Sequence, residues 1–171
     1  MIGVGAEQQP PASEGHPERF GLGEPASMDL IQRLDIDVRP DGTGLPEGSG
    51  TAAAGAPVYA ARCASCHGPS GEGATANQLV GAAPVGASPA TIGNYWPYAT
   101  TLFDYIRRAM PTNAPGSLST AEVYGLTAWL LAANGIIDTD ADINAQTLPL
   151  VRMPARNIFV PDDRLDANTV R

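Results

Sequence analysis

Cysteine and histidine are scarce in this sequence of 171 residues, which has two of each. Cys63 and Cys66 share one short stretch, RCASCHGPSGEG, and His67 follows at once. The other histidine, His16, lies in a polar leader. A structural zinc site usually takes its four ligands as two Cys/His pairs, so the lack of a second pair argues against zinc.

A β-branched run is also lacking before Cys63, where GTAAAGAPVYAAR indicates a helix. A thioredoxin-like dithiol would instead follow a buried strand. The motif C-x-x-C-H fits covalent attachment of haem c, because positions i, i+3 and i+4 of a helical turn share one face. We therefore predict one haem c attached to Cys63 and Cys66, with His67 as an axial ligand of the iron.

Long apolar runs and an excess of positive charge are absent too. With no run of 18 apolar residues, we expect no membrane span, and the net charge of −8 argues against a nucleic-acid partner. Residues 1 to 20 lack the basic start and apolar stretch of a secretory signal, so we expect a mature or trimmed chain. Attachment of haem through thiols takes place outside the bacterial cytoplasm, so we expect a periplasmic protein.

The middle of the chain carries three helix patterns. Thr51 can cap a helix that runs through Tyr59 into the C-x-x-C-H motif. In TTLFDYIRRAM, apolar residues recur at helical spacing, with Thr100 or Thr101 as the cap. In residues 117–135, SLSTAEVYGLTAWLLAANG supplies a capping box from Ser119 to Glu122 near its start and Gly135 at its end. Gly55 and Tyr59 of the first helix suit a close crossing with Leu126 and Trp129 of the last.

Nine of the 19 glycines and six of the 16 prolines fall within the first 50 residues, and Pro149, Pro154 and Pro161 are spaced along the last stretch of the chain. We expect an N-terminal arm over residues 1–50 with one short helix capped by Ser27, a haem domain over 51–135, and an extended C-terminal strap over 136–171. The strap either wraps the haem domain or reaches a partner, because its apolar residues are too many to leave in water. These residues are Ile143, Leu148, Leu150, Val151, Ile158, Phe159 and Val160.

An electron carrier needs a second axial ligand, and the candidates are few. Met110 ends a helix before the turn-rich PTNAPGS, so we predict that it binds the iron with His67. Met153 in RMPAR is the main rival, and Met28 and His16 are the others. As with most methionines at helical spacing, Met110 could instead be a core residue.

Three aromatic residues and two arginines are further candidates for haem contacts. Tyr95, Trp96 and Tyr98 in NYWPY either line the haem edge and bind a propionate or form ordinary core. Arg107 and Arg108 either pair with propionates or form a solvated helix face.

With these features located, residues 51–135 resemble class I c-type cytochromes. A narrower resemblance, to the SoxD-type cytochrome subunits of sulfane dehydrogenases, covers almost the whole chain. The stretches that carry it are DIDVRPDGTGLPEGSG, TIGNYWPYATTLFDYIRRAMP, SLSTAEVYGLTAWLLAANGII and TLPLVRMPARNIFVPD. The resemblance implies an all-α class I cytochrome c fold with extended N- and C-terminal arms.

The resemblance also implies partners. These are a molybdenum-cofactor catalytic subunit of the SoxC type, the sulfur-carrier protein that this subunit oxidises, and a downstream electron acceptor. The chain itself would be an electron-transfer subunit of an oxidoreductase complex and not catalytic alone. It departs from the dihaem members of the family because it has a single C-x-x-C-H motif.

Three other functions remain open at the level of sequence. Related cytochrome subunits serve sulfite dehydrogenases, so the sulfur substrate is one open point. A free soluble electron-transfer cytochrome c would suit the small size and high charge. A haem enzyme or gas sensor would need an open iron site, which a methionine ligand would close.

Overall fold

The computed structural model describes residues 21–160, and contacts divide the chain into two units, Met1–Asp35 and Ile36–Arg171. In the first unit, the described residues form one helix, α1 (Met28–Leu34). The amide of Leu30 donates to the hydroxyl of Ser27 at 3.2 Å, which confirms the predicted cap. None of the residues of α1 is buried. His16 lies outside the described residues.

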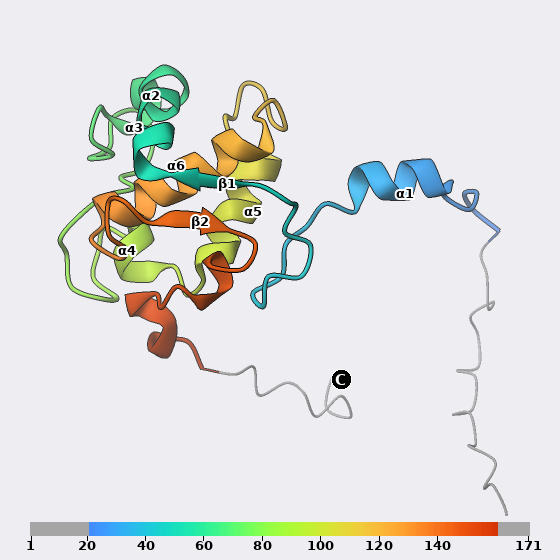
Figure 1. Ribbon diagram of the computed structural model, residues 1–171. Coiled ribbons are helices and arrows are strands. Elements are labelled where there is room, and N and C mark those ends of the chain that lie inside the picture. Colours follow the sequence, from blue (N-terminus) through green and yellow to red (C-terminus); the bar gives the residue numbers. More distant parts are fainter. Residues whose placement is uncertain (1–20, 161–171) are drawn as a thin grey trace, which may run out of the picture. The chain divides into compact units, whose positions relative to one another are not determined.

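The second unit is mostly helical, as expected (Figure 1). Its described helices are α2 (Ala52–Arg62), α3 (Ala64–His67), α4 (Ile92–Tyr95), α5 (Ala99–Ala109) and α6 (Thr120–Ala133). Helices α2 and α5 both pack against α6, which is buried along most of its length. The longest helix among the described residues, α6, has 14 residues, and none is long and apolar enough to cross a membrane.

Two glycines allow α2 and α6 to cross closely. A Cβ atom on Gly55 would collide with the carbonyl group of Gly125, and one on Gly125 would lie 3.1 Å from the Gly55 nitrogen. Beside this contact the rings of Tyr59 and Trp129 stack with centroids 3.8 Å apart. The predicted crossing is therefore confirmed, and Gly125 is a further partner in it that was not predicted.

The ends of α6 follow their sequence signals. Ser119 and Glu122 form the predicted capping box, in which each side chain accepts from the backbone amide of the other. At the other end, Gly135 has a φ of +68°, and the amides of Gly135 and Ile136 donate to the carbonyls of Ala132 and Leu131. This pair of bonds is the Schellman motif, which favours glycine at its left-handed position.

The start of α5 differs from the prediction. Neither Thr100 nor Thr101 caps it, because the N-cap residue is Tyr98, whose side chain makes no capping bond. Thr100 is buried within the first turn, and its hydroxyl donates to the carbonyl of Pro40 at 3.2 Å. The Thr100 hydroxyl therefore makes a long-range hydrogen bond to the segment before α2 and does not cap α5.

Two short strands bring the segment before α2 together with the strap, and neither was predicted. β1 (Ser49–Thr51) pairs antiparallel with β2 (Asp142–Asn144), so that Gly50 lies opposite Ile143. Figure 1 shows the two strands side by side, next to α6. Two 3₁₀ helices follow in the strap, η1 (Leu148–Leu150) and η2 (Pro154–Ile158).

The strap buries part of its apolar side chains on the helices. Ile143 and Leu148 are 3% and 0% exposed and belong to the hydrophobic core. Leu150, Ile158, Phe159 and Val160 are exposed. The strap is therefore anchored to the second unit, and its last described residues present an apolar surface. The domain boundaries at residues 50 and 135 stay a prediction.

Candidate haem-binding site

A cavity of about 520 Å³ lies between the C-x-x-C-H motif, α5 and α6. Cys63, Cys66, His67 and Met110 all line it, although Met110 is 43 positions beyond His67 in the chain. The structure thus brings together four of the seven predicted site residues. Apolar side chains form much of the wall, and these are Leu79, Ile106, Leu126 and Leu130.

The motif is presented on a tight turn between α2 and the one-turn helix α3. Cys63 ends α2, and its carbonyl accepts from the amides of Cys66 at 3.1 Å and His67 at 3.0 Å. This winding directs all three side chains to one cavity. Both cysteines are free thiols, and burial raises the pKa of the Cys63 thiol. The arrangement offers two separate thiols rather than a disulfide.

A backbone carbonyl fixes the orientation of the His67 ring. Nδ1 of His67 lies 2.7 Å from the carbonyl oxygen of Asn77. A carbonyl oxygen only accepts, so Nδ1 carries the proton and donates. Nε2 is then left with its lone pair as the free donor for a metal, which is the usual second-shell arrangement for a histidine ligand.

The end of α5 places Met110 at the cavity. Met110 is the C-cap residue, and its amide donates to the carbonyl of Ile106 at 3.2 Å. The hydroxyl of Thr112 lies 3.6 Å from the Met110 sulfur. The thioether therefore reaches the same cavity as the His67 ring, and it has a polar neighbour of its own.

A buried hydrogen bond connects α2 to the end of the C-x-x-C-H motif. The hydroxyl of Tyr59 donates to the carbonyl of Gly68, directly after the motif, at 2.9 Å. Burial raises the pKa of Tyr59 to about 12, so this hydroxyl stays protonated at neutral pH. The bond ties α2 to the residue that follows His67.

The rival methionine, Met153, does not line the cavity. Its side chain is 4% exposed and packs in the hydrophobic core. Met28 lies on α1, in the other unit, with 67% of its surface exposed. Among the described methionines, only Met110 lines the cavity.

The three aromatic candidates do not meet at this cavity. Tyr95 is 48% exposed and contacts Phe159 edge-on, with centroids 5.5 Å apart. Trp96 packs edge-on against Tyr105, and the guanidinium of Arg156 lies 4.1 Å from the centre of the Tyr98 ring. Their placement at a haem edge has no support from this geometry.

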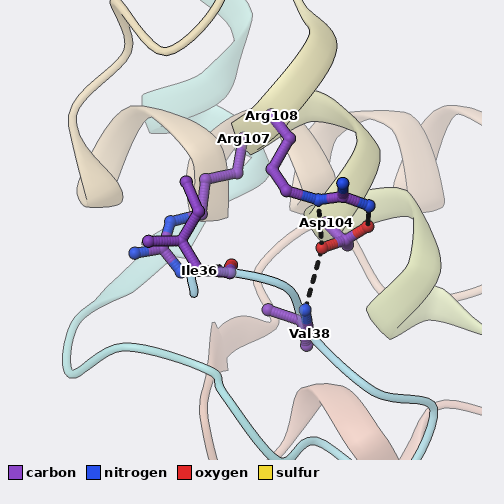
Figure 2. A network of polar contacts seen from close by, with 5 residues as sticks. All are labelled: Ile36, Val38, Asp104, Arg107 and Arg108. Carbon is purple, nitrogen blue, oxygen red and sulfur yellow. Dashed lines mark hydrogen bonds and ion pairs between the residues drawn. The ribbon is translucent and has the colours of Figure 1, made fainter. Parts of the chain in front are cut away.

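Arg107 and Arg108 bind the chain itself (Figure 2). Arg108 forms a two-pronged ion pair with Asp104, one bond of which is 2.8 Å from Nε to Oδ1. Oδ1 of Asp104 also accepts from the amide of Val38 at 2.8 Å, and Arg107 donates to the carbonyl of Ile36 at 3.1 Å. These two arginines hold the segment before β1 on α5, and neither is among the residues that line the cavity.

Burial alone would raise the pKa of the Asp104 carboxyl. The hydrogen bonds from Arg108 and Val38, together with the nearby positive charges, outweigh burial and lower this pKa. The same bond to Asp104 raises the pKa of Arg108. Asp104 is therefore ionised at neutral pH.

The residues around the cavity fit haem c. Two free thiols at C-x-x-C spacing, an imidazole with a free Nε2 and a thioether surround one apolar space. Sequence reasoning found these four residues but missed Asn77, Leu79 and Thr112. Asn77 acts through its carbonyl, which every residue has, so no sequence signal could have marked it.

Comparisons with known proteins agree with this assignment. Residues 50–130 match the family described as cytochrome C oxidase, cbb3-type, subunit III. No curated protein sequence matches the chain significantly. A chain in the crystal structure of the sulfane dehydrogenase SoxCD from Paracoccus pantotrophus is similar, with 38% sequence identity and a TM-score of 0.77. The match covers 88% of this chain and 76% of that one. The fold is therefore that of a cytochrome c, and the chain belongs to the SoxD-type c-type cytochromes.

Proposed function

We propose that this protein is a monohaem electron-transfer subunit that accepts electrons from a molybdenum-containing sulfane dehydrogenase subunit. The observation that carries the proposal is the convergence of Cys63, Cys66, His67 and Met110 on one cavity. The similarity to a chain of the SoxCD crystal structure supports the choice of partner. In this proposal the protein passes the electrons to a downstream acceptor and is not catalytic alone.

Each residue has a defined part in binding the haem. The S–H groups of Cys63 and Cys66 would add across the two vinyl groups, forming one S–C and one C–H bond each, with no oxidant required. Nε2 of His67 and the sulfur of Met110 would bind the iron. Once bound, the haem supplies a one-electron couple. The apolar residues Ile106, Leu126 and Leu130, which line the cavity, would keep water from the iron, and a methionine ligand would favour the ferrous state.

The proposal places the protein in the periplasm, where it would join a hetero-oligomer that oxidises sulfur compounds. Haem attachment through thiols outside the cytoplasm supports this location. The sulfur-carrier protein would interact through the catalytic subunit and not with this chain. A sulfite dehydrogenase is the alternative complex, because related cytochrome subunits serve such enzymes.

Affinity purification of the tagged holoprotein from periplasm tests this function. We expect a catalytic subunit to copurify, with molybdenum detected by elemental analysis, and the haem of the complex to be reduced when protein-bound sulfane sulfur is added. Reduction by sulfite alone would identify the alternative complex. A protein that purifies alone and exchanges electrons with many unrelated partners would contradict the proposal in favour of a free carrier.

A further inference from the structure

A hydroxyl group lies beside the sulfur of Met110. Oγ1 of Thr112 is 3.6 Å from Sδ of Met110, and both residues line the cavity. Among the described residues, the Thr112 hydroxyl makes no other hydrogen bond that competes for its proton. The thioether sulfur has no proton to give, so the hydroxyl is the donor and the sulfur is the acceptor.

The position of the Thr112 hydroxyl is set by the backbone on both sides of it. Before it, the amide of Met110 is fixed to the carbonyl of Ile106 at the end of α5. After it, the amide of Ala114 donates to the carbonyl of Pro111 at 2.8 Å and closes a turn in which Thr112 is the second residue. The loop after α5 thus holds the hydroxyl next to the sulfur.

A hydrogen bond at this sulfur has two chemical consequences. A thioether sulfur has two lone pairs, so a donor that occupies one of them leaves the other for a metal. A donor also withdraws electron density from the sulfur, and weaker donation by the ligand destabilises ferric iron more than ferrous iron. The first effect selects the configuration at sulfur, and the second raises the reduction potential.

We infer that Thr112 is a positioning residue for the axial methionine, whose hydroxyl selects the iron-binding lone pair of the Met110 sulfur and raises the potential of the haem. This inference rests on the proposed function, because it requires Met110 to bind the iron. Thr112 acts through Met110 and does not itself bind the iron.

The test compares three variants of the holoprotein. Thr112→Val keeps the shape of the side chain and removes the hydroxyl, and Thr112→Ser restores the hydroxyl. Thr101→Val is the matched control, because Thr101 lies on α5 but does not line the cavity. Thr112 is exposed, so its substitution leaves the folded core intact. The measurements are the midpoint potential, the long-wavelength charge-transfer band of methionine-ligated ferric haem, and the NMR shifts of the Met110 methyl group.

We expect Thr112→Val to keep the charge-transfer band but to favour the ferric form by about threefold at a fixed ambient potential, as suits loss of one weak hydrogen bond. The Met110 methyl resonance should shift or split as the second lone pair becomes available. Thr112→Ser and Thr101→Val should match the wild type.

Two results would overturn the inference, and they are distinguishable. If the wild type has the methionine band but Thr112→Val has the wild-type potential and methyl shift, then Thr112 has no such role, and the proposed function stands. If the wild type lacks the methionine band and the shifted methyl signal, Met110 is not a ligand, and both this inference and the axial assignment on which it rests are wrong.

Discussion

Two methionines with similar local sequence have different environments. Met110 and Met153 both precede a proline, but Met110 lines the cavity whereas Met153 is buried in the core. We expect Met110→Ala to lose the methionine charge-transfer band and to lower the potential, because the iron loses its thioether ligand. Met153→Ala should keep the band but lose about 2–5 kcal/mol of the free energy of unfolding, as buried methionine truncations do.

Visible spectroscopy and denaturant titration of the two variants check this prediction. The loss of the band in Met153→Ala, together with its retention in Met110→Ala, would show that the axial ligand is the other methionine.

The Asp104 carboxylate should make stability depend on pH. Its pKa is lowered in the folded protein, so its contribution is present above the unfolded pKa of about 4 and is lost as the pH falls through the folded value. We expect Asp104→Asn to lose about 1.5–3 kcal/mol of unfolding free energy at pH 7, since the bonds to Arg108 and Val38 are charge-assisted. This difference between wild type and variant should shrink below about pH 4.

Urea titrations at neutral and acid pH measure this effect. Asp29→Asn is the matched control, because Asp29 and Arg33 form the same i,i+4 pair on an exposed helix surface, where it is worth at most about 0.5 kcal/mol. Equal losses in both variants, or a loss in Asp104→Asn that grows as the pH falls, would contradict the role given to the Asp104 pair.

At the scale of secondary-structure elements, the close crossing of α2 and α6 reverses the stability change that helix propensity predicts for a glycine-to-alanine substitution. Alanine in an exposed helix is favoured over glycine by about 1 kcal/mol. We expect Gly55→Ala instead to destabilise the protein by about 1–3 kcal/mol, because the added Cβ would collide with the Gly125 carbonyl and force the helices apart.

Gly125→Ala should destabilise the protein less than Gly55→Ala, because the added Cβ would lie 3.1 Å from the Gly55 nitrogen. Thermal unfolding of both variants gives the order. A stabilised Gly55→Ala variant would mean that the two helices do not approach each other closely.

Elements with local signals were predictable from sequence. The caps at Ser27, Thr51 and Ser119 and the stop at Gly135 each involve residues three to five positions apart, so the sequence contains both partners. The C-x-x-C-H motif is local in the same sense. Met110 was predictable because a helix end and a proline mark its place.

Elements that depend on distant partners were not predictable. Strands β1 and β2 have three residues each and pair across some ninety positions of the chain. The bond from His67 to Asn77 depends on the path of the loop between them. The aromatic residues of NYWPY could lie at a haem edge or in the core, because sequence does not reveal their neighbours. Helix α4 carried a usable signal, since Thr91 and Asn94 form a capping box.

At the scale of the whole molecule, an exposed apolar patch of Tyr95, Ile158, Phe159 and Val160 is the feature most relevant to a partner. The first three are each between 44% and 48% exposed, and Val160 is 86% exposed. If the catalytic subunit covers this patch, Ile158→Ser and Phe159→Ser should weaken its binding about tenfold or more and slow haem reduction by substrate. The haem spectrum should not change, because these residues do not line the cavity.

Point substitutions are the suitable test of this surface, because removal of the whole strap would expose the core that Ile143 and Leu148 complete. Leu150→Ser is the matched control, as Leu150 is an exposed strap residue outside the patch. Binding measured against the purified catalytic subunit should be unchanged in the control. Normal binding by both patch variants would place the interface elsewhere.

Electron transfer by this chain requires one haem, which we propose is attached covalently through Cys63 and Cys66. The most direct measurement is the intact mass of the protein under denaturing conditions, after expression in a strain competent for cytochrome c maturation. We expect the mass of the chain plus one haem, and loss of this addition in a Cys63→Ala/Cys66→Ala variant. An unmodified mass from the wild type, with the haem lost on denaturation, would contradict it.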